Sequence, residues 1–285
     1  MPTLLSMPSA SPDLLSPWYQ ARAALAEPDP VHKCRRVAVL WERVASGRWQ
    51  PDDPGEPGLL PCGRPGRPHM VPPARLPRRG LGTLEGRRAL IHAVAHIEFN
   101  AINLGLDAAL RFPGMPDAYY RDWLSVAADE ARHFSMLSDR LEELGGRYGD
   151  LPAHNGLWDM AEKTAHDPLV RMALVPRVLE ARGLDVTPGM IEKLAAVGDD
   201  RTVELLEVIL EEEEGHVAIG SRWFHYLCQE RGVAPEDTFR RLLEEYYKAP
   251  LRGPFNRPAR RRAGFSDVEI DRLVALDASP QDRPS

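Results

Sequence analysis

Two short stretches of the chain each place a carboxylate and an imidazole three residues apart. In "DEARH" Glu130 precedes His133, and in "EEEEGH" Glu213 precedes His216. Residues three apart in a helix lie about 4.5 Å apart along the axis and roughly 60° apart in rotation, so both side chains can reach one ion. Either stretch taken alone also fits a solvent-exposed charged helix face. The hypothesis of a metal site therefore depends on the remaining ligands.

Two further acids complete a repeated arrangement. Glu98 lies within the apolar stretch "AVAHIEFNAI", and Glu180 lies within "LVPRVLEARG". Glu130 follows Glu98 by 32 residues, and Glu213 follows Glu180 by 33 residues. A dinuclear carboxylate site in a four-helix bundle needs Glu-x-x-His from two helices and one Glu from each of the other two. The predicted metal ligands are therefore Glu98, Glu130, His133, Glu180, Glu213 and His216.

The types of ligand indicate which metals the site would bind. Carboxylates are hard anionic ligands that can bridge two cations, and imidazole adds a neutral nitrogen. This combination suits iron or manganese, so we expect two transition-metal ions, Fe/Fe or Mn/Fe, as cofactors. Without metal, four acids in a bundle core would be unfavourable unless they were protonated. The alternatives are an ion pair of Glu98 with an arginine, and of Glu180 with Arg177 or Arg182.

All six positions lie in segments whose apolar residues recur at helical spacing. Pro113 ends the first segment, and Gly145–Gly146 is a typical C-terminal signal for the second. Pro168 and Pro176 predict that the third segment is bent or interrupted. Thr187–Pro188 is typical of an N-cap followed by proline and predicts the start of a short connecting helix. The long helices are expected over residues 83–112, 116–144, 157–183 and 199–231.

No segment shows convincing strand alternation, so the fold class is expected to be all-α. Short connections between long helices favour antiparallel neighbours, which predicts a four-helix bundle made of two helix hairpins. Residues 51–82, here called the strap, are rich in Pro, Gly and Arg and are expected to be extended, after one N-terminal helix or a helix pair. Small helices are expected over residues 235–247 and 266–276. The predicted domains are 1–82 (N-terminal helical segment and strap), 83–232 (bundle with the di-metal site) and 233–285 (C-terminal helical extension and tail).

Composition limits the classes of protein that the chain can represent. With 285 residues and 43% hydrophobic content, it can bury a substantial core. A net charge of −6 argues against a dedicated nucleic-acid-binding protein. Three cysteines without a C-x-x-C pair indicate neither a disulfide framework nor a thiolate zinc site. The N-terminus lacks a signal-peptide pattern and no later segment predicts a membrane span, so we expect a soluble cytoplasmic protein.

At the predicted ligands the sequence resembles the ferritin-like superfamily of di-iron carboxylate proteins, whose pattern is E…ExxH…E…ExxH. "DEARH" also resembles the D-E-x-R-H form of bacterial multicomponent monooxygenases. From about Pro72 to Leu276 the chain is similar to a bacterial ferritin-like family known as domain of unknown function 455. The phrases that carry this similarity are "AHIEFNAI", "AADEARHF", "YGDLPAHNGLW", "VPRVLEARGLDVTPGMI" and "GHVAIGSRWF". The resemblance implies a fold and a metal site, but no substrate.

The resemblance also implies roles for individual residues. Glu130 and Glu213 would bridge the two metals, and the acids that precede them, Asp129 and Glu212, would orient the histidine N–H groups. Arg132 would steady Asp129. The sequence departs from the monooxygenase pattern at Glu212 and Gly215, where the pattern favours Asp and Arg. The remaining ligands would divide between the metals, with Glu98 and His133 on one and Glu180 and His216 on the other.

Several other polar residues are expected to lie outside the site. His96 is two positions from the first predicted carboxylate and so points about 160° away around the helix, which favours a core or interface role for His92 and His96. His225 lies on the helix face opposite the second predicted histidine, while His154 could line a loop over the site. The basic residues of the strap and tail are expected to pair with surface acids. They are Arg64, Arg67, Arg75, Arg78, Arg79, Arg260, Arg261 and Arg262.

The expected function is that of a di-metal oxidoreductase, which activates dioxygen or peroxide to oxidise an unidentified small-molecule organic substrate. Because the chain has no C-x-x-C rubredoxin site, electrons would come from an external reductase. One alternative is a ferritin-like tRNA hydroxylase, supported by the arginine-rich strap and loop 257–262. Others are a non-catalytic iron-binding or peroxide-detoxifying protein, and a structural protein with a vestigial site. We expect a monomer or homodimer with no membrane partner.

Overall fold

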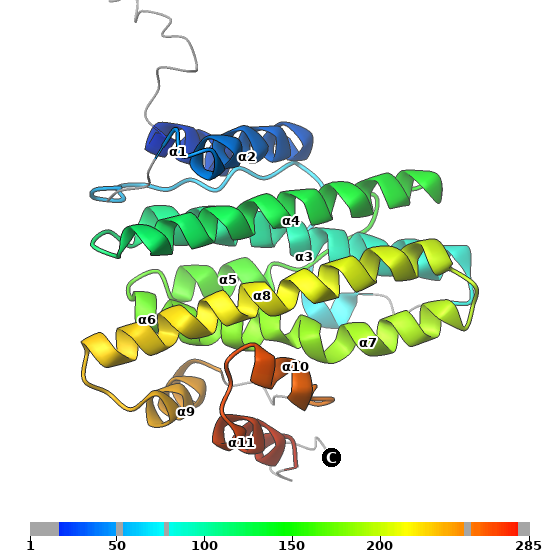
Figure 1. The fold of residues 1–285 in the computed structure, drawn as a ribbon. Helices are drawn as coiled ribbons and strands as arrows, with labels where there is room; N and C mark the ends of the chain where they lie inside the picture. Colours follow the sequence, from blue (N-terminus) through cyan, green and yellow to red (C-terminus); the bar gives the residue numbers. More distant parts are fainter. Residues whose placement is uncertain (1–16, 50–53, 77–79, 248–251, 279–285) are drawn as a thin grey trace, which may run out of the picture.

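The computed structural model describes residues 17–49, 54–76, 80–247 and 252–278, and this part of the chain consists mostly of helices, whereas residues 54–72 form no helix (Figure 1). Its only β-structure is an isolated bridge between Met70 and Ala153. The prediction of an all-α fold is therefore confirmed. The elements are α1 (Pro17–Ala26), α2 (Pro30–Ala45), the 3-10 turn η2 (Pro73–Arg75), α3 (Leu84–Arg111), α4 (Asp117–Glu143), α5 (Gly156–Lys163), α6 (Pro168–Leu174), the π-helical turn η3 (Val175–Glu180), α7 (Ala181–Ala195), α8 (Asp200–Glu230), α9 (Pro235–Tyr246), α10 (Arg257–Arg262) and α11 (Asp267–Ala278).

The helices are arranged in layers, as Figure 1 shows. Helices α1 and α2, drawn in blue, pack on α3 and α4. The hairpin of α3 and α4 meets the second long hairpin through contacts between α4 and α8. Helices α9, α10 and α11, drawn in orange to red, cover the opposite side and contact α6, α7 and α8. Together with residues 252–256 they are called the C-terminal layer. The predicted metal ligands therefore lie in the middle layers, while the division into three domains stays a prediction.

The N-terminal layer is a helix pair, one of the two arrangements expected. Asp29 caps α2 by accepting a hydrogen bond from the backbone N–H of His32. The ammonium group of Lys33 is fully buried, and donates to the carbonyls of Ala24 and Leu25 and to the side chain of Asn103 in α3. A buried charged group with three acceptors is satisfied, so this contact ties the pair to the central helices.

Helix α3 is the central helix of the fold. Thr83 caps its start by accepting from the N–H of Gly86, and residues 101–110 are all buried. At Gly105 a Cβ atom would lie 2.9 Å from the carbonyl oxygen of Trp123, so the glycine permits the close approach of α3 and α4. Among the described residues α3 alone is long and apolar enough to cross a membrane, but 72% of its apolar window is buried inside the protein. That burial is typical of a core helix.

Helix α4 ends at the glycine pair, as predicted. Gly145 has φ 74°, and its N–H donates to the carbonyl of Glu142, while the N–H of Gly146 donates to Leu141. These two bonds form a Schellman motif, which satisfies carbonyls that the helix end would leave free. The left-handed conformation at Gly145 favours glycine, because a Cβ would be strained there.

The third predicted helix, over 157–183, is interrupted, which is one of the two outcomes expected, and its helical residues belong to α5, α6, η3 and α7. Pro168 is the first residue of α6, where its missing N–H costs nothing, and Asp167 caps this start by accepting from the N–H of Leu169. Pro176 lies in the π-helical turn η3, which ends at Glu180. A proline cannot donate to the carbonyl four residues earlier, and the wider turn accommodates this loss.

The predicted helix start at Thr187–Pro188 is wrong, because both residues lie inside α7. Proline inside a helix leaves the carbonyl four residues earlier without its usual donor, here the carbonyl of Leu184. The side-chain amide of Asn256, just before α10, donates to this oxygen at 3.1 Å. The C-terminal layer thus supplies the hydrogen bond that lets α7 continue through Pro188.

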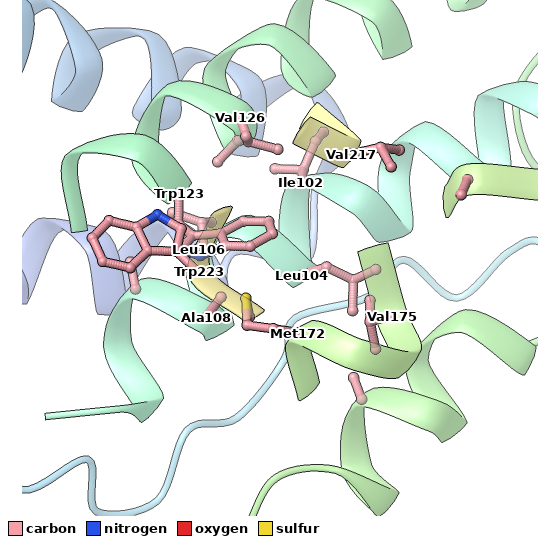
Figure 2. Packing of buried hydrophobic residues seen from close by; sticks show 14 of the residues in the cluster. Ile102, Leu104, Leu106, Ala108, Trp123, Val126, Met172, Val175, Val217 and Trp223 are labelled. Atoms are coloured by element: carbon pink, nitrogen blue, oxygen red, sulfur yellow. The ribbon is translucent and has the colours of Figure 1, made fainter. Parts of the chain in front are cut away.

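The hydrophobic core joins both long hairpins. Figure 2 shows apolar side chains from α3, α4, α6, η3 and α8 packed together in one cluster. Because each of these elements contributes to the same cluster, their relative positions are fixed by packing. The labelled residues are Ile102, Leu104, Leu106, Ala108, Trp123, Val126, Met172, Val175, Val217 and Trp223.

Candidate metal centre

The six predicted ligands come from four elements that meet between the two hairpins. All are buried except Glu213, whose side chain is only 13% exposed. Helix α3 carries Glu98, α4 carries Glu130 and His133, η3 ends with Glu180, and α8 carries Glu213 and His216.

Glu98, Glu130 and His133 form a first group that could hold a metal ion, with ligand atoms all within 4.8 Å of one another. The Nδ1 atom of His133 lies 3.2 Å from Oε2 of Glu130 and 3.5 Å from Oε2 of Glu98. Two carboxylates and one imidazole at this spacing are a donor set suited to iron or manganese. The first hairpin therefore provides one candidate metal position by itself.

Glu130, Glu213 and His216 form a second group of this kind. The Nδ1 atom of His216 lies 3.0 Å from Oε1 of Glu130 and 3.3 Å from Oε2 of Glu213. Glu130 thus belongs to both groups, and its two oxygens approach different histidines, Oε2 toward His133 and Oε1 toward His216. A carboxylate in this position can bridge two cations.

Glu180 lies outside both groups, although it is buried beside them. Its Oε2 atom has no hydrogen-bond partner in the part of the chain that the structure describes. The alternative of an ion pair with Arg177 or Arg182 is not realised, because Arg177 binds Glu269 and Arg182 donates to backbone carbonyls. A buried carboxylate oxygen without a donor is costly, and a cation would relieve that cost.

The acids of the cluster differ in their proton affinity. Burial raises the pKa of Glu98, Glu180 and Glu213, and neighbouring carboxylates raise it further. Burial would also raise the pKa of Glu130, but the nearby imidazoles lower it well below its usual value. Burial would lower the pKa of His133, but its contacts with carboxylates raise that pKa to about 11. Without cations the cluster thus retains protons that metal ions would displace.

The outward-facing histidine nitrogens contact acids from the opposite hairpin. His133 Nε2 lies 2.6 Å from Oε2 of Glu212, and His216 Nε2 lies 3.4 Å from Oδ2 of Asp129. Arg132 donates to both acids. Each histidine thus contacts an acid of the other hairpin, an arrangement that was not predicted. The role of both acids and Arg132 in orienting metal-bound histidines stays a prediction.

A second acid of α3 illustrates why Glu98 and not Asp107 lies in the cluster. Asp107 accepts from Arg111 in the next helical turn and from Arg171 of α6, at 2.5 Å and 2.7 Å. Both of its oxygens therefore have guanidinium partners. No arginine or lysine contact of this kind is found for Glu98 among the described residues, and its near neighbours are the ligands of the first group.

A cavity of about 680 Å³ adjoins the cluster. All four predicted carboxylate ligands line it, whereas neither histidine does. Most of the remaining lining side chains are apolar, and the volume is in the range of cavities that bind small organic molecules. The carboxylate side of the cluster therefore faces a mainly apolar cavity. The aliphatic part of the lining includes Val94, Ile97, Leu179, Met190, Leu206 and Leu210.

The other histidines have structural contacts or lie outside the groups. His92 accepts a hydrogen bond from the N–H of Gly149, and His96 contacts the hydroxyl of Tyr148 at 2.9 Å. The core or interface role expected for both is confirmed. His225 belongs to neither group of possible metal ligands, and His154 lines the cavity, as its loop position suggested.

The basic residues are largely engaged within the protein. Arg64 of the strap donates to the amide oxygens of Asn100 and Asn155, whereas a surface acid was expected. Arg78 and Arg79 lie outside the described residues. The pairing with surface acids is confirmed for Arg261 with Asp267 and for Arg262 with Glu214, whereas Arg260 pairs with the buried Asp185.

Comparison with known proteins identifies relatives but no activity. The model of the family described as "Protein of unknown function (DUF455)" matches residues 26–271. A Haemophilus influenzae protein described as "Uncharacterized protein" is 44% identical over 271 residues, which cover 91% of this chain and 94% of that protein. No solved structure matches this chain.

Proposed function

Since the chain belongs to the DUF455 family, whose description names no activity, we propose a function from the geometry of its own site. We propose that the protein is a di-metal oxidoreductase with a ferritin-like four-helix bundle, formed by α3, α4, the α6–η3–α7 segment and α8. It would use dioxygen or peroxide to oxidise an organic substrate bound in the cavity beside the four carboxylates.

The position of Glu130 carries this proposal. Its two oxygens approach the Nδ1 atoms of two histidines on different hairpins, at 3.2 Å and 3.0 Å. A salt bridge alone would need one such partner, whereas two neighbouring cation sites need a bridging carboxylate between them. Glu98 and His133 would complete the shell of one metal, and Glu213 with His216 that of the other. Glu180, with its partner-free oxygen, would bind the second metal.

The surrounding residues would prepare the site for this chemistry. The bound metals would supply the redox chemistry, with iron or an iron and manganese pair favoured by the donor set. Glu212 and Asp129 would accept the Nε2 protons of the histidines, so that each Nδ1 is free to coordinate. The apolar cavity would exclude water and hold the substrate on the carboxylate side. Electrons would come from a separate reductase.

Metal content tests the proposal directly. Protein purified without chelators should contain about two transition-metal ions per chain by mass spectrometry, a count that follows from the two sites. Glu130→Gln should lose most of this metal, because it removes the charge shared by both sites while keeping the side-chain shape. Glu211→Gln is the matched control, since Glu211 is an exposed acid of α8 outside the cluster. The metal-loaded parent should also consume dioxygen when supplied with a reductant.

Two results would contradict the proposal. The first is a folded parent that remains metal-free after anaerobic incubation with iron(II) and manganese(II). The second is equal metal content in Glu130→Gln and the parent, with both folded by circular dichroism. Metal binding without dioxygen or peroxide consumption would instead support the alternative of a non-catalytic iron-binding protein.

A further inference from the structure

The charged residues that line the cavity are divided by sign. Four are the carboxylates of the cluster, and four are arginines. The arginines come from η3, from α7 and from the C-terminal layer, which covers the bundle in Figure 1. They are Arg177, Arg182, Arg252 and Arg260.

The arginine group carries a surplus of positive charge. Arg177 is matched by Glu269, with hydrogen bonds of 2.9 Å and 2.8 Å to its two oxygens. The other three arginines share one acid, Asp185, which is bound by Arg260 at 2.7 Å and lies 3.7 Å from Arg182. Among the described residues, Asp185 is the acid with which these arginines form ion pairs, while the Asp277 carboxylate lies close to Gly253, next to Arg252.

Arg252 and Arg260 offer free donors. Arg252 is exposed, and its side chain forms no ion pair or hydrogen bond with the described residues. Arg260 has a side chain only 3% exposed, yet its Nη1 atom lacks a hydrogen-bond partner among the described residues. Arg182 donates to the carbonyls of Gly253 and Pro254, which holds the 252–254 segment against α7. The buried guanidinium of Arg260 and the exposed guanidinium of Arg252 can both donate hydrogen bonds to a carboxylate.

From this distribution we infer that the cavity binds an apolar organic acid, whose carboxylate contacts Arg252 and Arg260 while its hydrocarbon body points toward the metal cluster. The aliphatic lining beside the cluster favours a hydrocarbon at the inner end, and the arginines favour the carboxylate at the other end. The inference rests on the proposed function only for its claim that the cavity is the substrate site. Recognition of the acid itself depends on the arginines.

Three eight-carbon probes test this inference: octanoate, octan-1-ol and octylamine. Titration calorimetry should show octanoate binding at least about tenfold more tightly than octan-1-ol, and octylamine most weakly, because one charge-assisted contact has this order of effect. Octanoate affinity should fall as salt is raised, since Arg252 is exposed and its field is screened. Octan-1-ol affinity should change little with salt.

Substitution of Arg252 separates recognition of charge from simple burial of the hydrocarbon. Arg252→Ala should weaken octanoate binding about tenfold and leave the affinity for octan-1-ol unchanged. Arg252→Lys should retain most of the parent's preference for octanoate over octan-1-ol. Arg261→Ala is the control, because Arg261 is an exposed arginine that pairs with Asp267 and does not line the cavity. Equal affinities for octanoate and octan-1-ol, an Arg252→Ala protein with unchanged preference, or no binding of any probe would each overturn the inference.

Metal content measured on the same samples distinguishes the two proposals. Arg252-dependent octanoate binding by a protein that never binds metal would support the organic-acid site and contradict the di-metal oxidoreductase. A metal-loaded protein that consumes dioxygen but does not prefer octanoate would support the di-metal oxidoreductase and contradict the organic-acid site.

Discussion

At the scale of single residues, proton binding by the cluster would oppose the metal binding proposed for it. Five of its six groups have raised pKa values: the acids Glu98, Glu180 and Glu213, and both histidines. A group with a raised pKa binds its proton more tightly in the folded protein than in the unfolded chain. Only Glu130 has a lowered pKa and acts in the opposite sense. The metal-free fold is therefore stabilised by protons, which metal ions bound at the proposed site would displace.

The first prediction concerns pH. Stability from groups with raised pKa is fully present below their unfolded-state values, and is lost as pH rises toward the folded-state values, which for His133 reach about 11. The melting temperature of the metal-free protein should therefore fall by several °C from about pH 6 to about pH 9. The melting temperature of the metal-loaded protein should fall less over the same pH range, because metal binding strengthens as protons leave. Differential scanning fluorimetry measures both curves, and parallel curves would contradict the coupling.

A second prediction concerns the acids outside the cluster. Glu212→Gln removes the anion that contacts His133 Nε2 and Arg132, so the imidazole becomes a weaker and less well oriented ligand. Metal affinity, measured by competition with a chromophoric chelator, should fall by about 10- to 100-fold. Glu214→Gln on the same helix loses only an exposed contact with Arg262 and should bind metal like the parent. Equal affinity in both variants would exclude a role for Glu212.

At the scale of elements, the π-helical turn η3 determines where Glu180 points. Each residue of an α-helix turns by about 100°, so a wider turn changes the face on which the following residue lies. Pro176 within η3 packs against α8 at Gly220, where a Cβ would lie 2.4 Å from the Pro176 Cβ. The missing side chain at Gly220 therefore lets the π-helical turn approach α8 and its ligands.

The third prediction tests this contact. Gly220→Ala should destabilise the protein by about 1–3 kcal/mol, because the new methyl group overlaps the Pro176 ring and the backbones must separate. Gly215→Ala, on the same helix, meets nothing within 4 Å and should stabilise by about 0.5–1 kcal/mol through its helix propensity. Urea unfolding measures both changes. A neutral Gly220→Ala would mean that η3 can shift freely against α8.

The helices were predictable where their end signals are local. The expected segments 83–112, 116–144 and 199–231 match α3, α4 and α8 to within about one residue at each end, because caps and a glycine pair mark the boundaries. The third segment was not predictable in this way. Pro168 starts a helix, Pro176 lies in a π-helical turn and Pro188 sits inside a helix whose free carbonyl is bound by Asn256, which follows Leu184 by 72 residues. A local pattern cannot distinguish these outcomes.

The same limit applies to the site. The sequence spacing paired Glu98 with Glu130, which the structure places in one group, but it also paired Glu180 with Glu213, and Glu180 lies outside both groups. The crossed contacts of Glu212 and Asp129 and the cavity were not predictable, since they depend on how the two hairpins face one another. The position of Glu180 also depends on the π-helical turn, which its local sequence does not specify.

At the scale of the whole molecule, a buried ion pair attaches the C-terminal layer to the element that carries Glu180. Arg177 of η3 and Glu269 of α11 are both buried, and Glu269 also accepts from the backbone N–H of Ser266. The guanidinium lies within 4.5 Å of three phenyl ring centroids, which shield the pair from water. These rings are Phe224, Phe239 and Phe265.

The last prediction concerns this attachment. Glu269→Ala should destabilise the protein by about 3–5 kcal/mol, because it leaves the Arg177 guanidinium buried without its counter-charge. Asp271 lies on the same helix as Glu269 and forms an exposed ion pair with Arg257 of α10. Asp271→Ala should therefore lower the free energy of unfolding by at most about 1 kcal/mol. Replacing both charges, in Arg177→Met/Glu269→Leu, should recover much of the loss since no unpaired charge remains. Urea unfolding of the three variants measures these differences, and a Glu269→Ala protein as stable as Asp271→Ala would show that solvent reaches the arginine.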